Sequence, residues 1–160
     1  YSNTIGKPEI IELIRANIPV TSRILDVGPG AGVYSDKLTP LGYTLECVEI
    51  FEPNVEKFSL RQKYKSVFIQ DVRTFDVGAY DFVIFGDVIE HLEVAEAQRL
   101  IDACKVCMVA VPYEYVQGAH EGNEAEIHIQ DDLTPELMSE RYPDLHLVVY
   151  CQEYGYYVKG

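Results

Sequence analysis

The sequence predicts an α/β protein with a doubly wound, mostly parallel sheet of seven strands, an antiparallel C-terminal hairpin and helices on both faces. Short apolar runs alternate with helical spacings through five units, which is typical of a parallel sheet. The first apolar run stops at a cluster of glycines, as a strand does before a ligand-binding turn. The last two runs lie too close together for a crossover connection, so they have to pair antiparallel.

The predicted elements follow one another in a regular order. A first helix is expected from Ile10 to Ile18, because apolar residues recur at helical spacing and Pro8 suits a first helical turn. Strands are predicted at residues 23–27, 44–49, 66–70, 81–85, 106–111, 145–151 and 154–158. Helices are predicted between them at residues 33–41, 53–62 and 94–103. A capping threonine followed by proline, Thr134-Pro135, begins the last helix.

A long irregular segment, residues 112–133, follows the fifth strand, and loops of this length in compact domains are usually functional or disordered. Residues 106–140 contain no Lys or Arg but carry eight carboxylates: Glu114, Glu121, Glu124, Glu126, Asp131, Asp132, Glu136 and Glu140. The segment is either a solvated acidic loop or a surface that faces a neutral or cationic substrate or a metal ion. The net charge of −13 makes nucleic acid an unfavourable partner, since phosphate binding needs clustered Lys and Arg.

The size and composition fit one domain, residues 1–160, in a soluble globular protein. No apolar run approaches the ~20 residues that span a bilayer. The first residues lack the charged start and apolar run of a signal peptide, so we expect a cytoplasmic location and no membrane partner. Because the chain starts at Tyr1 rather than Met, we also expect a few upstream residues, and the sequence does not indicate whether they complete a lid. The sequence does not indicate an oligomeric state.

Four cysteines are too few for a disulfide scaffold at this length. Cys104 and Cys107 have the C-x-x-C spacing of some redox and zinc sites. Cys107 opens an apolar run, however, so we expect both to be small buried residues at the start of a strand.

The chemistry centres on residues 24–32, ILDVGPGAG, in which a buried strand runs into a glycine-rich turn before a helix. Glycines there allow positive φ angles and let the backbone approach a ligand closely. The pattern is G-x-G-x-G, with Asp26 two residues before the first glycine. A dinucleotide-binding loop has its third glycine one residue later, where this chain has Val33.

Polar residues also follow the second, third and fourth predicted strands. Glu49 ends the second strand, where a carboxylate can accept hydrogen bonds from both hydroxyls of a ribose; alternatively it is an exposed loop residue. Gln70-Asp71-Val72 follows the third strand, from which a side chain can reach an adenine edge. The fourth strand leads into Phe85-Gly86-Asp87-Val88-Ile89-Glu90-His91-Leu92.

Together these segments resemble the class I S-adenosylmethionine-dependent methyltransferases, specifically those with a D-V-I-E-H-L-type segment after the fourth strand. The resemblance covers nearly the whole chain and implies that the cofactor is S-adenosylmethionine. The residues that it assigns to the cofactor are Asp26, Gly28, Gly30, Gly32, Glu49, Ile50, Asp71, Val72 and Asp87.

The resemblance also implies a role for each of these residues. The three glycines contact the methionine part, while Asp26 holds the turn. Glu49 binds the ribose and Ile50 packs on the adenine. The pair Asp71-Val72 addresses the adenine rim, and Asp87 lies beside the cofactor and the substrate entrance.

The implied reaction is methyl transfer to a small neutral or cationic acceptor, on oxygen or nitrogen. A base is needed only when the acceptor must lose a proton. The candidate bases are His91 and His128, with Glu90 as the group that orients them; both histidines can equally be ordinary helix and loop residues. We expect residues 112–133 to fold over the methyl group, with Tyr113 and Tyr115 as walls of the acceptor pocket.

Other functions stay open. We expect no metal, although Asp87, Glu90, His91 and His128 could converge on a divalent ion. The RNA 3′-terminal 2′-O-methyltransferases have a similar segment, but here its first residue is Asp and the chain is acidic. The domain could also bind the cofactor without catalysis, as a partner subunit. A nicotinamide-dependent oxidoreductase is opposed by the glycine spacing and the terminal hairpin.

Overall fold

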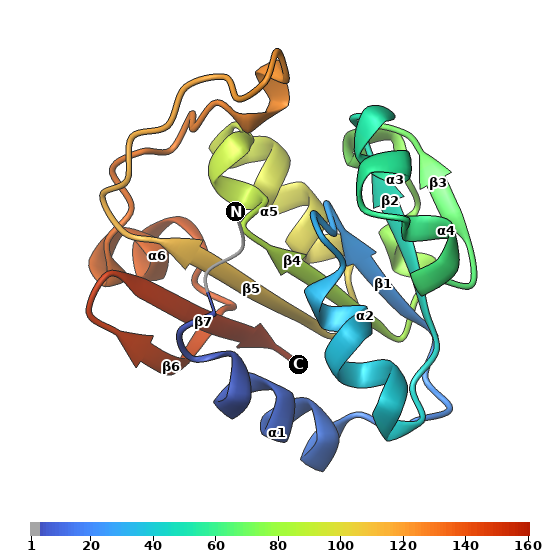
Figure 1. Ribbon diagram of the computed structural model, residues 1–160. Helices are drawn as coiled ribbons and strands as arrows, with labels where there is room; N and C mark the ends of the chain where they lie inside the picture. Colours follow the sequence, from blue (N-terminus) through green and yellow to red (C-terminus); the bar gives the residue numbers. More distant parts are fainter. Residues whose placement is uncertain (1–3) are drawn as a thin grey trace.

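The computed structural model describes residues 4–160, which form a seven-stranded sheet of order β3-β2-β1-β4-β5-β7-β6 (Figure 1). The strands are β1 (Ile24–Val27), β2 (Leu45–Glu49), β3 (Val67–Ile69), β4 (Phe82–Gly86), β5 (Cys107–Pro112), β6 (His146–Cys151) and β7 (Tyr154–Lys159). The first five pair in parallel, and β7 pairs antiparallel with both β5 and β6. The mostly parallel sheet with a closing hairpin is therefore confirmed.

The helices lie on both faces of this sheet, as the sequence predicts. They are α1 (Lys7–Asn17), α2 (Val33–Leu38), α3 (Pro53–Lys57), α4 (Leu60–Lys63), α5 (Val94–Ala103) and α6 (Pro135–Arg141). Short 3₁₀ helices are η1 (Thr39–Leu41), η2 (Val72–Thr74), η3 (Val77–Ala79), η4 (Ile89–His91) and η5 (Glu124–Glu126). In the part of the chain that the structure covers, no helix has the length and apolarity to cross a membrane.

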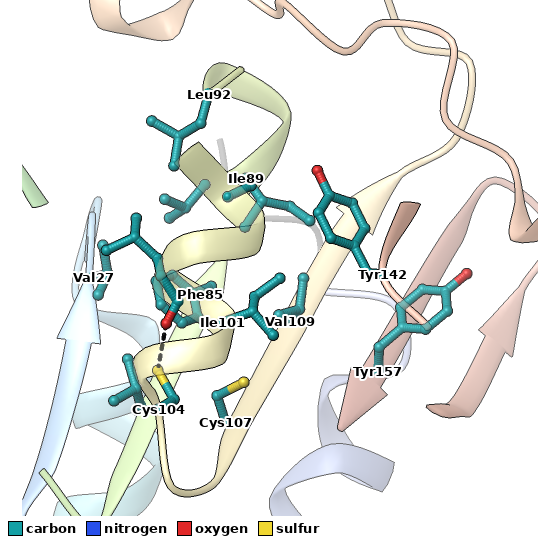
Figure 2. Close-up of a cluster of buried hydrophobic side chains, with 14 of the residues drawn as sticks. Val27, Phe85, Ile89, Leu92, Ile101, Cys104, Cys107, Val109, Tyr142 and Tyr157 are labelled. Atoms are coloured by element: carbon teal, nitrogen blue, oxygen red, sulfur yellow. Dashed lines mark hydrogen bonds between the residues drawn. The ribbon is translucent and has the colours of Figure 1, made fainter. Parts of the chain in front are cut away.

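Alternation along the buried strands divides the core between the two faces. Leu25 and Val27 of β1 pack in one cluster with α5 and α6, and Figure 2 shows Ile101 of α5 among the side chains of this cluster. Ile24, next to Leu25 in the chain, packs instead with α1, α2 and α4. Cys104 and Cys107 are buried in the first cluster, with the Cys104 thiol donating to the Leu100 carbonyl, so their expected packing role is confirmed (Figure 2).

One predicted helix is wrong in detail. The structure divides residues 53–62 into α3 and α4, with Phe58 and Ser59 between them. Ser59 has a φ of 52°, in the left-handed region that interrupts a helix. This break lets Phe58 pack partly buried against the core cluster that also contains Leu60. The expectation that the chain has no signal peptide rests partly on residues 1–3, which lie outside the described residues.

The topology brings the ends of several strands to one place. The strand order reverses between β1 and β4, and open α/β sheets bind ligands outside the carboxyl ends of their strands at such a point. Tyr154, which begins β7, lies opposite Pro112 at the end of β5. The antiparallel hairpin therefore adds its first residue to the edge where the parallel strands end.

Candidate functional site

A cavity of about 1230 Å³ lies at this edge of the sheet. Its wall includes residues that follow β1, β2, β3, β4 and β5, and the first residue of β7. Eleven of the twelve predicted site residues line it: Asp26, Gly28, Gly30, Glu49, Ile50, Asp71, Val72, Asp87, Glu90, His91 and His128. The structure thus brings together residues from widely separated parts of the chain.

The glycine turn after β1 has the open backbone that the sequence predicts. Gly28 and Gly30 have φ angles of 58° and 53°. The Gly28 N–H donates to the Val48 carbonyl at 2.9 Å, which ties the turn to β2. A Cβ on Gly30 would have no heavy atom within 4 Å, so its backbone faces open space.

Gly32 is the exception among the predicted site residues, and its place beside the cofactor stays a prediction. It does not line the cavity; it precedes α2 with a φ of 78°. A Cβ there would come within 2.8 Å of Lys63 Cδ. The third glycine is therefore required by the backbone conformation and by the close approach of Lys63.

Glu49 ends β2 with its carboxylate buried in the cavity wall. Its side chain is only 4% exposed. Oε1 accepts a 2.9 Å hydrogen bond from the Phe51 N–H, and Oε2 accepts a long one of 3.5 Å from Asn54. Burial raises the pKa of this carboxyl, while the hydrogen bond from Phe51 opposes the rise. Both oxygens keep lone pairs that a ligand hydroxyl can use.

Asp26 is held by a residue that the sequence did not indicate. Its Oδ2 accepts a 2.6 Å hydrogen bond from the hydroxyl of Tyr64, which lies just after α4. Burial raises the pKa of Asp26 to about 7, and the Tyr64 hydrogen bond and the charge of Lys7 partly oppose this. The structure therefore shows Asp26 bonded to Tyr64, while the turn itself is tied by the Gly28 N–H to Val48 and by the Gly32 N–H to Pro29.

Asp87 follows β4 in a left-handed conformation with a φ of 58°. Its Oδ1 accepts a short hydrogen bond from the Tyr154 hydroxyl, whereas its buried Oδ2 receives none from the described residues. Burial raises the pKa of Asp87 to about 6. Tyr154 also lines the cavity. Its place there depends on how β7 pairs with β5, which the sequence alone does not reveal.

Asp71 and Val72 form a separate corner after β3. The Asp71 side chain accepts from the Arg73 N–H and pairs with its guanidinium at 2.6 Å, which lowers the pKa of Asp71. Arg73 also pairs with Glu96. Among the described residues, Arg73 is the only Lys or Arg that lines the cavity. Its charge is already neutralised by the carboxylates of Asp71 and Glu96.

Glu90, His91 and His128 form another part of the cavity wall. Nε2 of His91 lies 3.9 Å from Glu90 Oε1, and Nε2 of His128 lies 4.0 Å from the same oxygen. The two imidazole rings meet edge to face, with centroids 4.7 Å apart. Burial raises the pKa of Glu90 well above its usual value and lowers that of His91. Asp87, the fourth candidate metal ligand, is not part of this cluster.

The acidic loop (residues 112–133, orange in Figure 1) extends beyond the top edge of the sheet in this view, the edge at which α3 also lies. It lines the cavity with residues from both of its limbs, and Lys57 of α3 pairs with Glu121 near its tip at 2.6 Å. Tyr115 is 54% exposed, and its ring centroid lies 5.6 Å from that of His128. Tyr113 also lines the cavity, but it is buried and its hydroxyl bonds to Tyr157.

The loop is fastened to the segment after β4. The backbone N–H groups of Ile129 and Gln130 both donate to the Glu90 carbonyl at 2.9 Å. The buried Gln130 side chain donates to the carbonyls of Ile89 and Leu92. These bonds place His128 beside Glu90, although the two residues are far apart in sequence.

The cavity is strongly acidic. Among the described residues, nine carboxylates line it: Asp26, Glu49, Asp71, Asp87, Glu90, Glu114, Glu124, Glu126 and Glu153. Against them stands the neutralised guanidinium of Arg73. A like-charged ligand group would meet repulsion here, whereas a cationic or neutral group would not.

Comparison with known proteins agrees with this architecture. Residues 7–158 match a family model described as a methyltransferase domain. A segment of 89 residues is 25% identical to the ubiquinone biosynthesis O-methyltransferase of Bordetella avium (strain 197N). That alignment covers 51% of this chain and 36% of the relative, so the matched part is about a third of the relative's length.

Solved structures show the same fold. An S-adenosylmethionine-dependent methyltransferase from Clostridium acetobutylicum superposes with a TM-score of 0.68 at 12% identity, covering 96% of this chain and 90% of that one. The 1,6-didemethyltoxoflavin-N1-methyltransferase of Burkholderia thailandensis, solved with its acceptor and S-adenosylhomocysteine, gives 0.68 at 14% identity, covering 98% and 78%. At these identities the likeness concerns the fold.

Proposed function

The chain belongs to the methyltransferase-domain family of class I S-adenosylmethionine-dependent methyltransferases, and from this premise we propose that it methylates a small neutral or cationic acceptor on oxygen or nitrogen. Its cofactor is S-adenosylmethionine. When bound, this cofactor supplies a methyl group that its sulfonium has already activated. The domain's own contribution is to bind, orient and exclude water around the reacting groups.

The residues on one side of the cavity fit this cofactor. We assign the methionine part to the open backbone at Gly28 and Gly30, and the ribose hydroxyls to the Glu49 carboxylate. The buried Asp87 Oδ2, which has no hydrogen-bond donor among the described residues, suits an ammonium group. The adenine is assigned to the corner that Ile50, Asp71 and Val72 form.

One observation carries the proposal of catalysis: a single cavity joins this cofactor side to the Glu90–His91–His128 cluster. Its volume of about 1230 Å³ exceeds the ~300–1,000 Å³ of a typical small-ligand pocket. The cavity therefore has room for an acceptor beside the cofactor, which supports an enzyme rather than a subunit that only binds S-adenosylmethionine. Holding two reactants in line can lower a barrier by roughly 7–11 kcal/mol.

The acceptor class follows from charge and shape. The carboxylates on the wall disfavour phosphorylated acceptors, including RNA, and favour amines, hydroxyl compounds and other neutral molecules. We assign the acceptor to the side where Tyr115, His91 and His128 form the wall. The aromatic faces of these residues offer packing surface to a flat or ring-containing molecule.

An acceptor screen tests the proposal. Purified protein is incubated with S-adenosylmethionine and a panel of small phenols, catechols, amines and amino alcohols, and S-adenosylhomocysteine formation is followed by mass spectrometry. Phosphorylated analogues and a short RNA serve as matched anionic acceptors. We expect turnover with neutral or cationic members alone; turnover that is faster with the phosphorylated analogues or the RNA would contradict the acceptor class.

A further inference from the structure

We propose that Glu90, His91 and His128 form a binding site for a divalent transition-metal ion that holds the acceptor by a hydroxyl oxygen. The proposal rests on the methyltransferase function proposed above and narrows it to O-methylation of acceptors with two adjacent oxygen donors. Three independent features of the cluster support it: the convergence of its ligand atoms, the tautomers of its imidazoles, and the missing partners of its carboxylate.

The ligand atoms converge on one point. One atom from each of the three side chains lies within 4.8 Å of the other two. Bonds of ~2.0–2.2 Å to a common metal would bring such atoms to about 3.3–3.5 Å from one another. The separations from Glu90 Oε1 to the two Nε2 atoms are 3.9 and 4.0 Å, and all the ligand atoms lie within 4.8 Å of one another, so a bound ion would draw them together. Without an ion these distances are too long for hydrogen bonds.

The hydrogen bonds of the histidines fix their tautomers. His91 Nδ1 lies 3.1 Å from the Ile127 carbonyl oxygen, and His128 Nδ1 lies 2.7 Å from that of Tyr115. A carbonyl oxygen only accepts, so both Nδ1 atoms carry hydrogen and donate. In the neutral rings the lone pair is then on Nε2, the atom that faces Glu90. Metal-binding histidines are commonly oriented by such a bond from the other ring nitrogen.

The Glu90 carboxylate lacks partners of its own. The residue is 1% exposed, and neither of its oxygens makes a hydrogen bond with the described residues. Its neighbours in the cluster present lone pairs, so among the described residues only a proton on Glu90 itself could lie between the carboxyl and the two acceptor nitrogens. Burying a carboxylate without a compensating charge is costly, and a cation at this point supplies that charge.

The backbone holds this arrangement in place. Glu90 and His91 belong to the short helix η4, and the carbonyl of Glu90 accepts from the N–H groups of Ile129 and Gln130. His128 is thereby fixed beside η4 by the residues that follow it. A metal site requires ligands whose backbone is held rigidly by hydrogen bonds, as it is here.

The donor set selects the ion and its chemistry. Two imidazoles and one carboxylate suit Mn²⁺, Fe²⁺, Co²⁺ or Zn²⁺, whereas Mg²⁺ prefers oxygen ligands. Three protein ligands leave coordination positions open toward the cavity, and two adjacent acceptor oxygens can occupy them. The ion lowers the pKa of the bound hydroxyl, whose proton passes to solvent. The oxygen then bonds the methyl carbon while the C–S bond breaks, and its electron pair stays on sulfur as S-adenosylhomocysteine forms.

Cobalt is the probe for the test, because it reports binding without turnover. Metal-free protein is titrated with Co²⁺ while visible absorption and calorimetry are recorded, for the wild type, Glu90→Gln and His128→Gln. His146→Gln, on the exposed edge strand β6, is the matched control. We expect one Co²⁺ per chain with d–d absorption bands, at least tenfold weaker binding in both cluster variants, and unchanged binding in the control.

Other readouts separate the two proposals. Thermal unfolding and S-adenosylhomocysteine affinity, measured on the same variants, report folding and the cofactor site. Failure of the wild type to bind S-adenosylhomocysteine would count against the proposed function while leaving a Co²⁺ site standing. The metal site is overturned if wild-type protein binds no Co²⁺, if folded cluster variants bind it as tightly as the control, or if a chelator leaves full activity on a catechol acceptor.

Discussion

The Tyr64 hydroxyl donates a 2.6 Å hydrogen bond to the buried Asp26 carboxylate, and this pair joins the strand that precedes the glycine turn to the segment after α4. Asp26 lines the cavity, whereas Tyr64 lies outside its wall. Their contact links the ionisation of one buried carboxyl to the stability of the whole fold, because Asp26 is 1% exposed and its pKa is raised to about 7.

The first prediction concerns pH. The unfolded chain loses the Asp26 proton near its ordinary pKa of 3.8, while the folded chain keeps it to about 7. The folded state binds more protons in this window, so the stability that this group contributes falls as pH rises from about 4 to 7, by at most about 1.4 kcal/mol per pH unit. Asp26→Asn should remove this loss, and denaturant unfolding of the variant and the wild type at pH 5, 6, 7 and 8 measures it.

The exposed Asp102→Asn serves as the control, since it lies on α5 away from the cavity. Relative to wild type, Asp26→Asn should become more stable with rising pH, whereas the control should keep a constant difference. A difference between Asp26→Asn and wild type that stays the same from pH 5 to 8 would show that Asp26 titrates near its ordinary value in the folded protein.

The second prediction tests the ribose site. Glu49→Ala should weaken S-adenosylhomocysteine binding at least about tenfold, because each lost hydrogen bond to a charged group is worth ~1.5–3 kcal/mol. Glu49→Gln keeps the shape and should weaken binding less. Glu56→Ala, exposed on α3 and outside the cavity wall, is the control. Equal dissociation constants for Glu49→Ala and the control in calorimetry would remove the assignment of the ribose to Glu49.

The elements that locate the cavity are local in sequence, which is why they could be predicted. Apolar runs that contain Asp26 or lead into Glu49 and Asp87 mark strands, and parallel strands bring their carboxyl ends to one edge of a sheet. The glycines at positions 28 and 30 likewise predict the positive φ angles that the structure has there. Residue spacing and the family resemblance together therefore indicated eleven residues of the cavity wall.

What the sequence left out depends on contacts between distant segments. Tyr154 reaches Asp87 only because β7 pairs antiparallel with β5, a register that no periodicity encodes. Gln130 is likewise one polar residue among many in the loop until its partners, the carbonyls of Ile89 and Leu92, are known. The sequence also does not separate a glycine that a turn requires from one that a ligand requires, and the structure gives Gly32 a backbone reason of its own.

The third prediction concerns cofactor choice. S-Adenosylhomocysteine should raise the melting temperature, whereas NADH at the same micromolar concentration should not. A pyrophosphate needs the start of a helix approached through a later glycine, and α2 begins at Val33 instead. The Asp87 carboxylate in the same cavity also repels it. Equal stabilisation by the two compounds in a thermal-shift experiment would count against a site built for S-adenosylmethionine.

The last prediction separates the two sides of the cavity by way of Gln130. Its buried side chain donates to the carbonyls of Ile89 and Leu92 and accepts from the Tyr142 hydroxyl, so Gln130→Ala leaves several buried groups without partners. We expect a loss of about 2–4 kcal/mol in the free energy of unfolding. The control is Gln98→Ala, whose side chain makes one exposed hydrogen bond and should cost less than about 0.5 kcal/mol.

Because Gln130 fastens the acidic loop to the segment that carries Glu90, its loss should loosen the acceptor side alone. The glycine turn and Glu49 make no contact with this side chain, so S-adenosylhomocysteine affinity should stay within about twofold of wild type. Co²⁺ affinity and turnover should fall together, because His128 is then no longer held beside Glu90. If cofactor affinity fell while Co²⁺ binding stayed intact, the loop would be a cofactor lid, and the acceptor would have to be assigned elsewhere.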